Sequence, residues 1–184
     1  MHRSELEHII RAACSITGED NLVIIGSQAI LASYPSGALP EQLTLSMEAD
    51  VFYLKENSQE LTDLIDGTIG ELSIFQDSFG IYAHGVGKET AILPKGWETR
   101  LVALNNENTS GYTGLCLDPY DLCVSKLFAG RPKDLSYVSV LLQADLLDFA
   151  IVQERINLVE DSVEKKEFAL HFLSQWSKGE QDNK

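Results

Sequence analysis

The chain has 184 residues, of which 44% are hydrophobic and 23% are charged, and this ordinary globular composition excludes wholesale disorder. Its formal net charge is −14 at pH 7, which repels polyanions and so disfavours tight non-specific binding to nucleic acids. No apolar run approaches the roughly 20 residues of a membrane span, and residues 1–10 are too polar for a signal peptide. The three cysteines are scattered and form no C-x-x-C pair, so we expect a reduced, cytoplasmic protein.

The first predicted elements are a helix and a buried strand joined to a second helix by a tight turn. Residues 4–17 carry apolar side chains at helical spacing, and residues 22–25 are a run of branched apolar residues that is typical of a buried strand. This strand ends in Gly26 and Ser27, and residues 28–33 have helix-forming composition. Free backbone N–H groups and the positive end of a helix dipole at such a turn suit a phosphate. The alternative is an ordinary strand-to-helix turn.

A strand over residues 45–53 follows a loop, and it carries two acids on one face. Side chains of a strand point alternately to opposite faces, so Glu48 and Asp50 emerge together, about 6.5–7 Å apart along the chain. Two carboxylates at this distance repel each other unless a cation lies between them, and Mg²⁺ usually takes one or two carboxylates plus substrate phosphates. Glu48 and Asp50 are therefore candidate metal ligands and catalytic residues. The alternative is the solvated face of an edge strand, where acids prevent pairing with other strands.

The remaining elements divide the chain into a strand-rich middle and a helical end. After a helix over residues 58–69, short strands are predicted at residues 71–75, 80–86, 91–93, 100–105 and 114–117. Helices are predicted over residues 118–130, 132–144, 149–160 and 163–178. The sequence thus predicts an α/β (α+β) fold with a small mixed sheet flanked by helices in residues 1–117. A helical part forms residues 118–179, and residues 180–184 are expected to fray.

The turn and the acidic strand together resemble a known signature. A Gly-Ser turn after an apolar strand, followed on the next strand by an acid-x-acid pair, resembles the nucleotidyltransferase superfamily, which shares the fold of DNA polymerase β. Residues 118–142 (DPYDLCVSKLFAGRPKDLSYVSVLL) are similar to the helical segment of bacterial nucleotidyltransferase-like proteins related to AbiEii-type toxins. In that segment an Asp, a Lys and a later basic–Asp pair recur along two helices. The two matches span most of residues 22–142.

The resemblance implies roles for particular residues. Gly26 and Ser27 would bind the triphosphate, and Lys126 and Lys133 of the helical part would reach the nucleotide phosphates, with Asp121 as an additional candidate. For these charged residues the alternative is a set of surface ion pairs, each of which contributes little.

Catalytic members of the superfamily usually add a third carboxylate from a later strand, and this sequence does not show one clearly. In the strand over residues 80–86, His84 lies where that acid would be useful, and Asp77 lies in a predicted turn. Histidine can act as a base or as a metal ligand, because its reference pKa is about 6.5. The alternative for His84 is a half-buried strand residue with a local hydrogen bond.

These expectations combine into two hypotheses. The first is a Mg²⁺-dependent nucleotidyltransferase that moves a nucleoside monophosphate from an NTP, with ATP expected, to a hydroxyl on a protein, an RNA end or a small molecule. The resemblance suggests a toxin–antitoxin or defence context, and a homo-oligomer is one expected form. The second hypothesis is a catalytically weakened module of the same fold that binds a nucleotide or a partner protein.

Overall fold

The computed structural model describes residues 1–35, 37–55 and 57–179, and it divides into two compact units. The first unit comprises Met1–Thr90 and Arg100–Asp118, and the second comprises Ala91–Thr99 and Pro119–Lys184. The frayed tail predicted for residues 180–184 lies outside the described residues. Within the described ranges, every helix is too short or too polar to cross a lipid bilayer.

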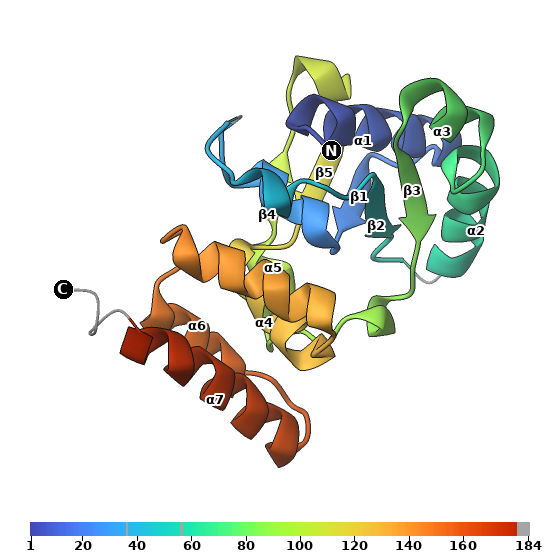
Figure 1. The fold of residues 1–184 in the computed structure, drawn as a ribbon. Helices are drawn as coiled ribbons and strands as arrows, with labels where there is room; N and C mark the ends of the chain where they lie inside the picture. The colour runs from blue at the N-terminus through green and yellow to red at the C-terminus, as the bar shows by residue number, and fades with distance from the viewer. Residues whose placement is uncertain (36, 56, 180–184) are drawn as a thin grey trace. The chain divides into compact units, whose positions relative to one another are not determined.

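The first unit is built on a five-stranded mixed sheet with the strand order β3-β2-β1-β5-β4 (Figure 1). The strands are β1 (Asn21–Ile24), β2 (Glu48–Phe52), β3 (Tyr82–Gly85), β4 (Val102–Leu104) and β5 (Thr113–Cys116). Strand β1 pairs antiparallel with β2 and parallel with β5, whereas β2 and β3 run parallel and β4 and β5 form an antiparallel hairpin. The predicted α/β class, with a small mixed sheet flanked by helices, is confirmed.

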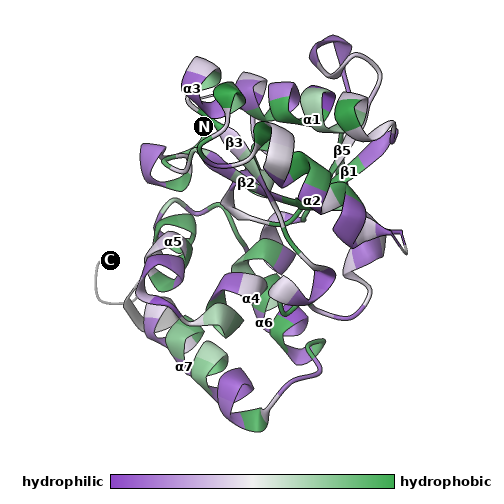
Figure 2. Ribbon diagram, turned by 90° about the vertical axis from the view of Figure 1, so that its right-hand side faces the viewer, coloured by the Kyte–Doolittle hydropathy of each residue, from purple (hydrophilic) through white to green (hydrophobic). Residues whose placement is uncertain are grey.

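Helices α1 (Arg3–Thr17) and α2 (Ser58–Ile69) pack against each other and against one face of this sheet. The strand register places Ile24, Val51 and Cys116 on the same face, and all three are fully buried. Gly114 lies on this face as well, and a Cβ there would lie 2.4 Å from the Ile10 side chain of α1. In Figure 2, α1 alternates between hydrophobic and hydrophilic residues, as expected for a helix with one buried side.

Several short elements of the first unit differ from the elements predicted from the sequence. The helix expected over residues 28–33 is a short 3-10 helix, η1 (Ser27–Ala32), and β2 begins at Glu48, so that the preceding residues 45–47 lie outside the sheet. The strand predicted at residues 71–75 is wrong, because residues 71–73 form a turn and helix α3 (Ile74–Phe79) begins directly after it. The Ser73 hydroxyl accepts the backbone N–H of Gln76 and caps that helix. Residues 91–93 form no strand. Further 3-10 helices are η2 (Glu41–Leu43), η3 (Lys88–Thr90), η4 (Trp97–Arg100) and η5 (Glu107–Thr109).

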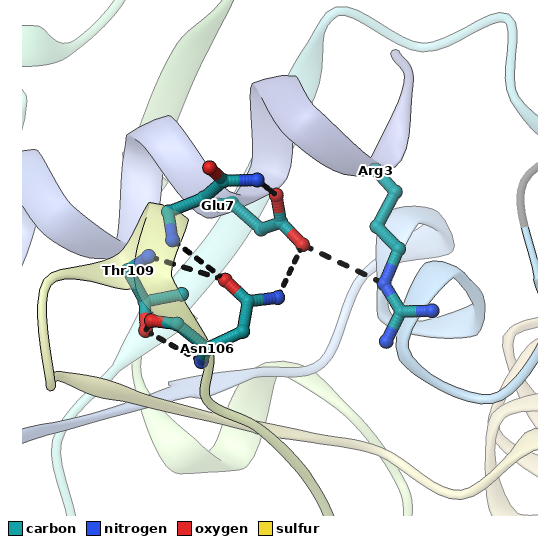
Figure 3. A network of polar contacts seen from close by, with 5 residues as sticks. Arg3, Glu7, Asn106 and Thr109 are labelled. Atoms are coloured by element: carbon teal, nitrogen blue, oxygen red, sulfur yellow. Dashed lines mark hydrogen bonds and ion pairs between the residues drawn. The ribbon is translucent and has the colours of Figure 1, made fainter.

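A buried carboxylate ties the β4–β5 hairpin to α1 (Figure 3). Glu7 of α1 is 4% exposed and accepts hydrogen bonds from the side-chain amides of Asn106 at 2.7 Å and Asn108 at 2.8 Å. Arg3 lies 3.7 Å from the same carboxylate. The side-chain Oδ1 atom of Asn106 in turn accepts the backbone N–H groups of Asn108 and Thr109, which caps η5. This network holds the hairpin loop against the start of α1.

The second unit contains four helices among its described residues: α4 (Pro119–Ala129), α5 (Pro132–Gln143), α6 (Phe149–Asn157) and α7 (Val163–Gly179). Helix α4 contacts the other three. Gly130, with φ 65°, ends α4, and Pro132 begins α5 at a position where proline needs no N–H donor. The Asp148 side chain accepts the backbone N–H of Ala150 and caps α6. The four helices predicted for the end of the chain are confirmed, with boundaries that shift by up to three residues.

Candidate functional site

The two predicted acids and one histidine come together on adjacent strands of the first unit. The parallel pairing of β2 with β3 sets Glu48 opposite Tyr82 and Asp50 opposite His84. Because paired residues of neighbouring strands point to the same face, the two acids and the histidine share one side of the sheet. The intervening residue Ala49 is fully buried on the other side, against which α1 and α2 pack. The alternation predicted from the sequence for the two acids is therefore present in the sheet.

The three side chains are close enough to share one cation. The Nδ1 atom of His84 lies 2.8 Å from a carboxylate oxygen of Glu48 and 3.5 Å from one of Asp50. The possible ligand atoms of all three residues lie within 4.8 Å of one another. Neighbouring ligands around an octahedral ion at 2.0–2.1 Å stand about 3 Å apart, so the donor set fits a divalent cation. Among the described residues, this is the one such group of three or more His, Cys, Asp or Glu side chains.

The electrostatics of this group favour positive charge between the acids. Partial burial opposes protonation of His84, but the carboxylates of Glu48, Asp50 and Asp66 outweigh it and raise the pKa of the imidazole. Burial and the neighbouring Glu48 carboxylate raise the pKa of Tyr82, which keeps its phenol neutral. Excess negative charge is thus concentrated at the place where the three donors converge, which suits a cation.

The predicted glycine turn lies directly against this group. A Cβ atom added to Gly26 would lie 1.9 Å from a carboxylate oxygen of Asp50, so any larger residue there would have to displace the Asp50 side chain. The backbone of Gly26 has φ −75°, which any residue adopts, so the requirement for glycine comes from the approach of Asp50. The Ile25 N–H also donates to the Asp50 carbonyl at 3.1 Å. Ser27 follows, half-buried, as the first residue of η1. The turn and the acids therefore belong to one local structure.

The other predicted residues have local partners or lie outside the group. Within the second unit, Lys126 lies 3.3 Å from a carboxylate oxygen of Asp134 and its Nζ lies 4.5 Å from the centroid of the Tyr137 ring. Lys133 is exposed on α5, and the fully buried Asp121 lies 3.7 Å from the Arg155 guanidinium. Their roles toward a nucleotide stay predictions.

Asp77 was expected in a turn, and that prediction is wrong, because it lies in the first turn of α3. Its side chain is exposed and does not belong to the group formed by Glu48, Asp50 and His84.

Comparison with protein families agrees with this geometry. Over residues 4–184 the sequence matches the family described as "Nucleotidyltransferase of unknown function (DUF6036)". The chain belongs to this nucleotidyltransferase family. The resemblance predicted from the turn and the acidic strand is therefore confirmed at the level of the superfamily. Searches of the curated proteins and of the solved structures found no match.

Two features of this nucleotidyltransferase, one beside the glycine turn and one beside His84, could not be predicted from the sequence. Gln28 is fully buried, and neither polar atom of its side chain has a hydrogen-bond partner among the described residues. Asp66 of α2 accepts the backbone N–H of Gly85 at 2.7 Å, which anchors the end of β3 next to His84. Neither the burial of Gln28 nor the Asp66–Gly85 hydrogen bond follows from residue spacing in the sequence, because both depend on how distant segments pack.

Proposed function

We propose that this nucleotidyltransferase binds an NTP, with ATP as the expected nucleotide, together with a divalent cation such as Mg²⁺. It transfers the nucleoside monophosphate to an acceptor hydroxyl. The acceptor hydroxyl loses its proton to solvent, its oxygen forms a bond to the α-phosphorus, the bond from that phosphorus to the bridging oxygen breaks, and pyrophosphate leaves. The observation that supports this proposal most strongly is the close approach of Gly26 to Asp50, beside Glu48 and His84.

Each residue of the site would have a separate task. Glu48, Asp50 and His84 would hold the cation, which, when bound, neutralises charge on the phosphates and lowers the pKa of a coordinated hydroxyl. The backbone N–H groups at Gly26 and the Ser27 hydroxyl would donate hydrogen bonds to phosphate oxygens. Such a reaction depends mainly on positioning and charge neutralisation, so the tightly packed turn would act by fixing the phosphate relative to the acids.

The helical unit would contribute positive charge. In the proposed complex, Lys126 and Lys133 would bind phosphate oxygens of the nucleotide, and Asp121 would support α4 through its ion pair with Arg155. Lysine binds phosphate as a flexible point charge, and the Lys126 ammonium, which lies 3.3 Å from Asp134, would exchange that carboxylate for a phosphate.

The net charge of the chain affects which kind of acceptor it can bind. A chain with a formal net charge of −14 repels an RNA end, so we favour a hydroxyl on a partner protein or a small molecule. We place the reaction in the cytoplasm, in a toxin–antitoxin or defence context, and we include a homo-oligomer among the forms to be tested.

A second function deserves a direct test because of one observation. The position on β3 opposite Asp50 carries His84, where catalytic members of the superfamily would have a third carboxylate. A histidine that pairs with the two acids, in place of a third carboxylate, would favour a module that binds a nucleotide or a partner protein without transferring a nucleotidyl group.

Transfer of label from α-³²P-labelled NTPs tests the enzyme proposal. Wild type and Asp50→Asn are incubated with each NTP, Mg²⁺ or Mn²⁺, and a cell extract, and labelled products are separated by size. Asp63→Asn, which changes an exposed acid on α2 by the same chemistry, is the matched control. We expect transfer by wild type and Asp63→Asn and a loss of at least about a hundredfold in Asp50→Asn. Equal transfer by Asp50→Asn would refute the proposed role of the acids.

Calorimetry separates the two functions. If the chain is a binding module, wild type will bind ATP in the presence of a divalent cation and Asp50→Asn will bind it more weakly, while no label moves in any extract. If none of the NTPs binds to wild type, the enzyme and the nucleotide-binding form of the module are both wrong.

A further inference from the structure

The third donor of the site is a nitrogen atom, and this feature changes which cation the site should prefer. Glu48 and Asp50 offer oxygen atoms, whereas His84 offers the Nδ1 atom that lies 2.8 Å from the Glu48 carboxylate. We propose that His84 makes the site selective for a first-row transition ion, Mn²⁺, over Mg²⁺. This inference rests on the proposed function, because it concerns the same cation site.

The selectivity follows from the chemistry of the donors. Mg²⁺ is a hard ion that takes oxygen ligands and gives up its water molecules reluctantly, so an imidazole is a poor ligand for it. Imidazole suits transition ions, and carboxylates suit both Mg²⁺ and Mn²⁺. A set of two carboxylates and one imidazole therefore adds affinity for Mn²⁺ without adding affinity for Mg²⁺. An aspartate in place of His84 would remove that difference.

The backbone holds His84 beside the acids. The N–H of Tyr82 donates to the Met47 carbonyl at 3.0 Å, and the N–H of Val86 donates to the Val51 carbonyl at 2.9 Å. These bonds lie on either side of His84 and fix the register of β3 against β2. The imidazole therefore stays opposite Asp50, and a cation held by both carboxylates is within its reach.

The side chain of His84 is 51% exposed, so replacing it should leave the fold intact. The test compares Mn²⁺ and Mg²⁺ affinities of the full chain, measured by electron paramagnetic resonance of free Mn²⁺ with Mg²⁺ as competitor. The variants are His84→Asp, which restores an all-carboxylate set, and His84→Asn, which removes the nitrogen without adding charge. His171→Asp on α7 is the matched control, because it makes the same change at another exposed histidine.

We expect the ratio of Mn²⁺ to Mg²⁺ affinity to fall by about tenfold in His84→Asp and in His84→Asn, and to stay unchanged in His171→Asp. Electron spin echo measurements on wild type with bound Mn²⁺ should show modulation from an imidazole nitrogen, and this modulation should be absent from His84→Asp. An unchanged ratio in a folded His84 variant, or Mn²⁺ bound to wild type without nitrogen modulation, would overturn the inference.

A separate variant distinguishes failure of this inference from failure of the proposed function. If Asp50→Asn weakens binding of both ions while the His84 variants keep the wild-type ratio, the cation site stands and the selectivity is wrong. If neither ion binds to wild type, or Asp50→Asn binds both as wild type does, the site itself is wrong and both proposals fail.

Discussion

At the scale of single residues, the candidate site depends on the contact between a glycine and a carboxylate. A glycine after a buried strand is compatible with many turns, and the sequence alone left the ordinary turn open. The steric exclusion at Gly26 comes from Asp50, which is 24 positions away in sequence. Glu48 and Asp50 could be predicted because the two-residue period of a strand fixes their common face. The place of His84 could not, because it depends on the register between β2 and β3.

Replacing Gly26 by alanine tests this contact. The added methyl group would overlap the Asp50 carboxylate, so we expect Gly26→Ala to lower the free energy of unfolding by about 1–3 kcal/mol and to weaken divalent-cation binding. Gly67→Ala is the matched control, because a Cβ there meets no atom within 4 Å and lies inside α2, where alanine is favoured by up to about 1 kcal/mol. Urea unfolding measures the free energy of unfolding of both variants. A Gly26→Ala protein as stable as wild type would show that Asp50 has room to move.

Gln28 provides a second prediction at this scale. Both polar atoms of its buried side chain lack partners among the described residues, and an unsatisfied buried polar group costs about 1–3 kcal/mol. Methionine has a similar shape and no such requirement, so we expect Gln28→Met to raise the free energy of unfolding by about 1 kcal/mol. Thermal and urea unfolding of the two proteins check this. A destabilised Gln28→Met protein would indicate that the amide has a partner in solution, such as an ordered water molecule.

At the scale of elements, the main error concerns residues 71–75. Their apolar and β-branched composition favours a strand, but Ser73 caps a helix at one end and Gly80, with φ 71°, ends it at the other. Capping at the two ends of α3 therefore outweighs the strand-like composition of these residues. The helical end of the chain was predicted well, because its apolar periodicity, its Pro132 start and its Gly130 stop agree with one another.

The turn before α3 stores backbone strain. Leu72 has φ 62°, in the left-handed region where a side chain costs roughly 1–2 kcal/mol, and it is 89% exposed, so it gains little from burial. We expect Leu72→Gly to raise the free energy of unfolding by about 0.5–1 kcal/mol, because the relief of strain exceeds the added entropy of the unfolded chain. Leu64→Gly, at an exposed leucine inside α2, should instead destabilise the protein. Equal effects of the two changes in urea unfolding would contradict this reading.

The start of α5 carries an ion-pair cluster of Lys126, Arg131 and the buried Asp134, and this cluster predicts a pH dependence. Burial opposes ionisation of Asp134, but the charges and hydrogen bonds of Arg131 and Lys126 outweigh it and lower the pKa of the carboxyl group. A lowered pKa in the folded state contributes stability above the unfolded value of about 3.9, and this contribution is lost as the pH falls through the folded pKa.

Asp134→Asn should therefore destabilise the protein at pH 7 by about 3 kcal/mol, because it removes the buried carboxylate that faces the poorly exposed Lys126 ammonium. The difference from wild type should shrink when unfolding is measured below pH 4. Asp161→Asn, at an acid that pairs with Lys165 on the surface, should have a much smaller effect at both pH values. A difference that is independent of pH would show that the cluster does not stabilise the fold through charge.

At the scale of the whole molecule, two separated stretches of sequence were enough to predict the nucleotidyltransferase superfamily. The turn with the acidic strand and the later helical segment each combine local rules, and together they indicate a nucleotidyltransferase, in agreement with the family match over residues 4–184. The order of the strands and the pairing of β2 with β3 could not be predicted, because they depend on contacts between distant residues. The sequence therefore indicates which acids matter, whereas the three-dimensional structure shows that Gly26 and His84 adjoin them.

The most direct test of the central claim is a crystal structure of the chain grown with Mn²⁺ and a non-hydrolysable ATP analogue, with data collected at the manganese absorption edge. We predict an anomalous peak within bonding distance of the Glu48 and Asp50 carboxylates, with triphosphate oxygens of the analogue beside Gly26 and Ser27. Manganese or nucleotide bound elsewhere, with Glu48 and Asp50 contacting neither, would contradict the account.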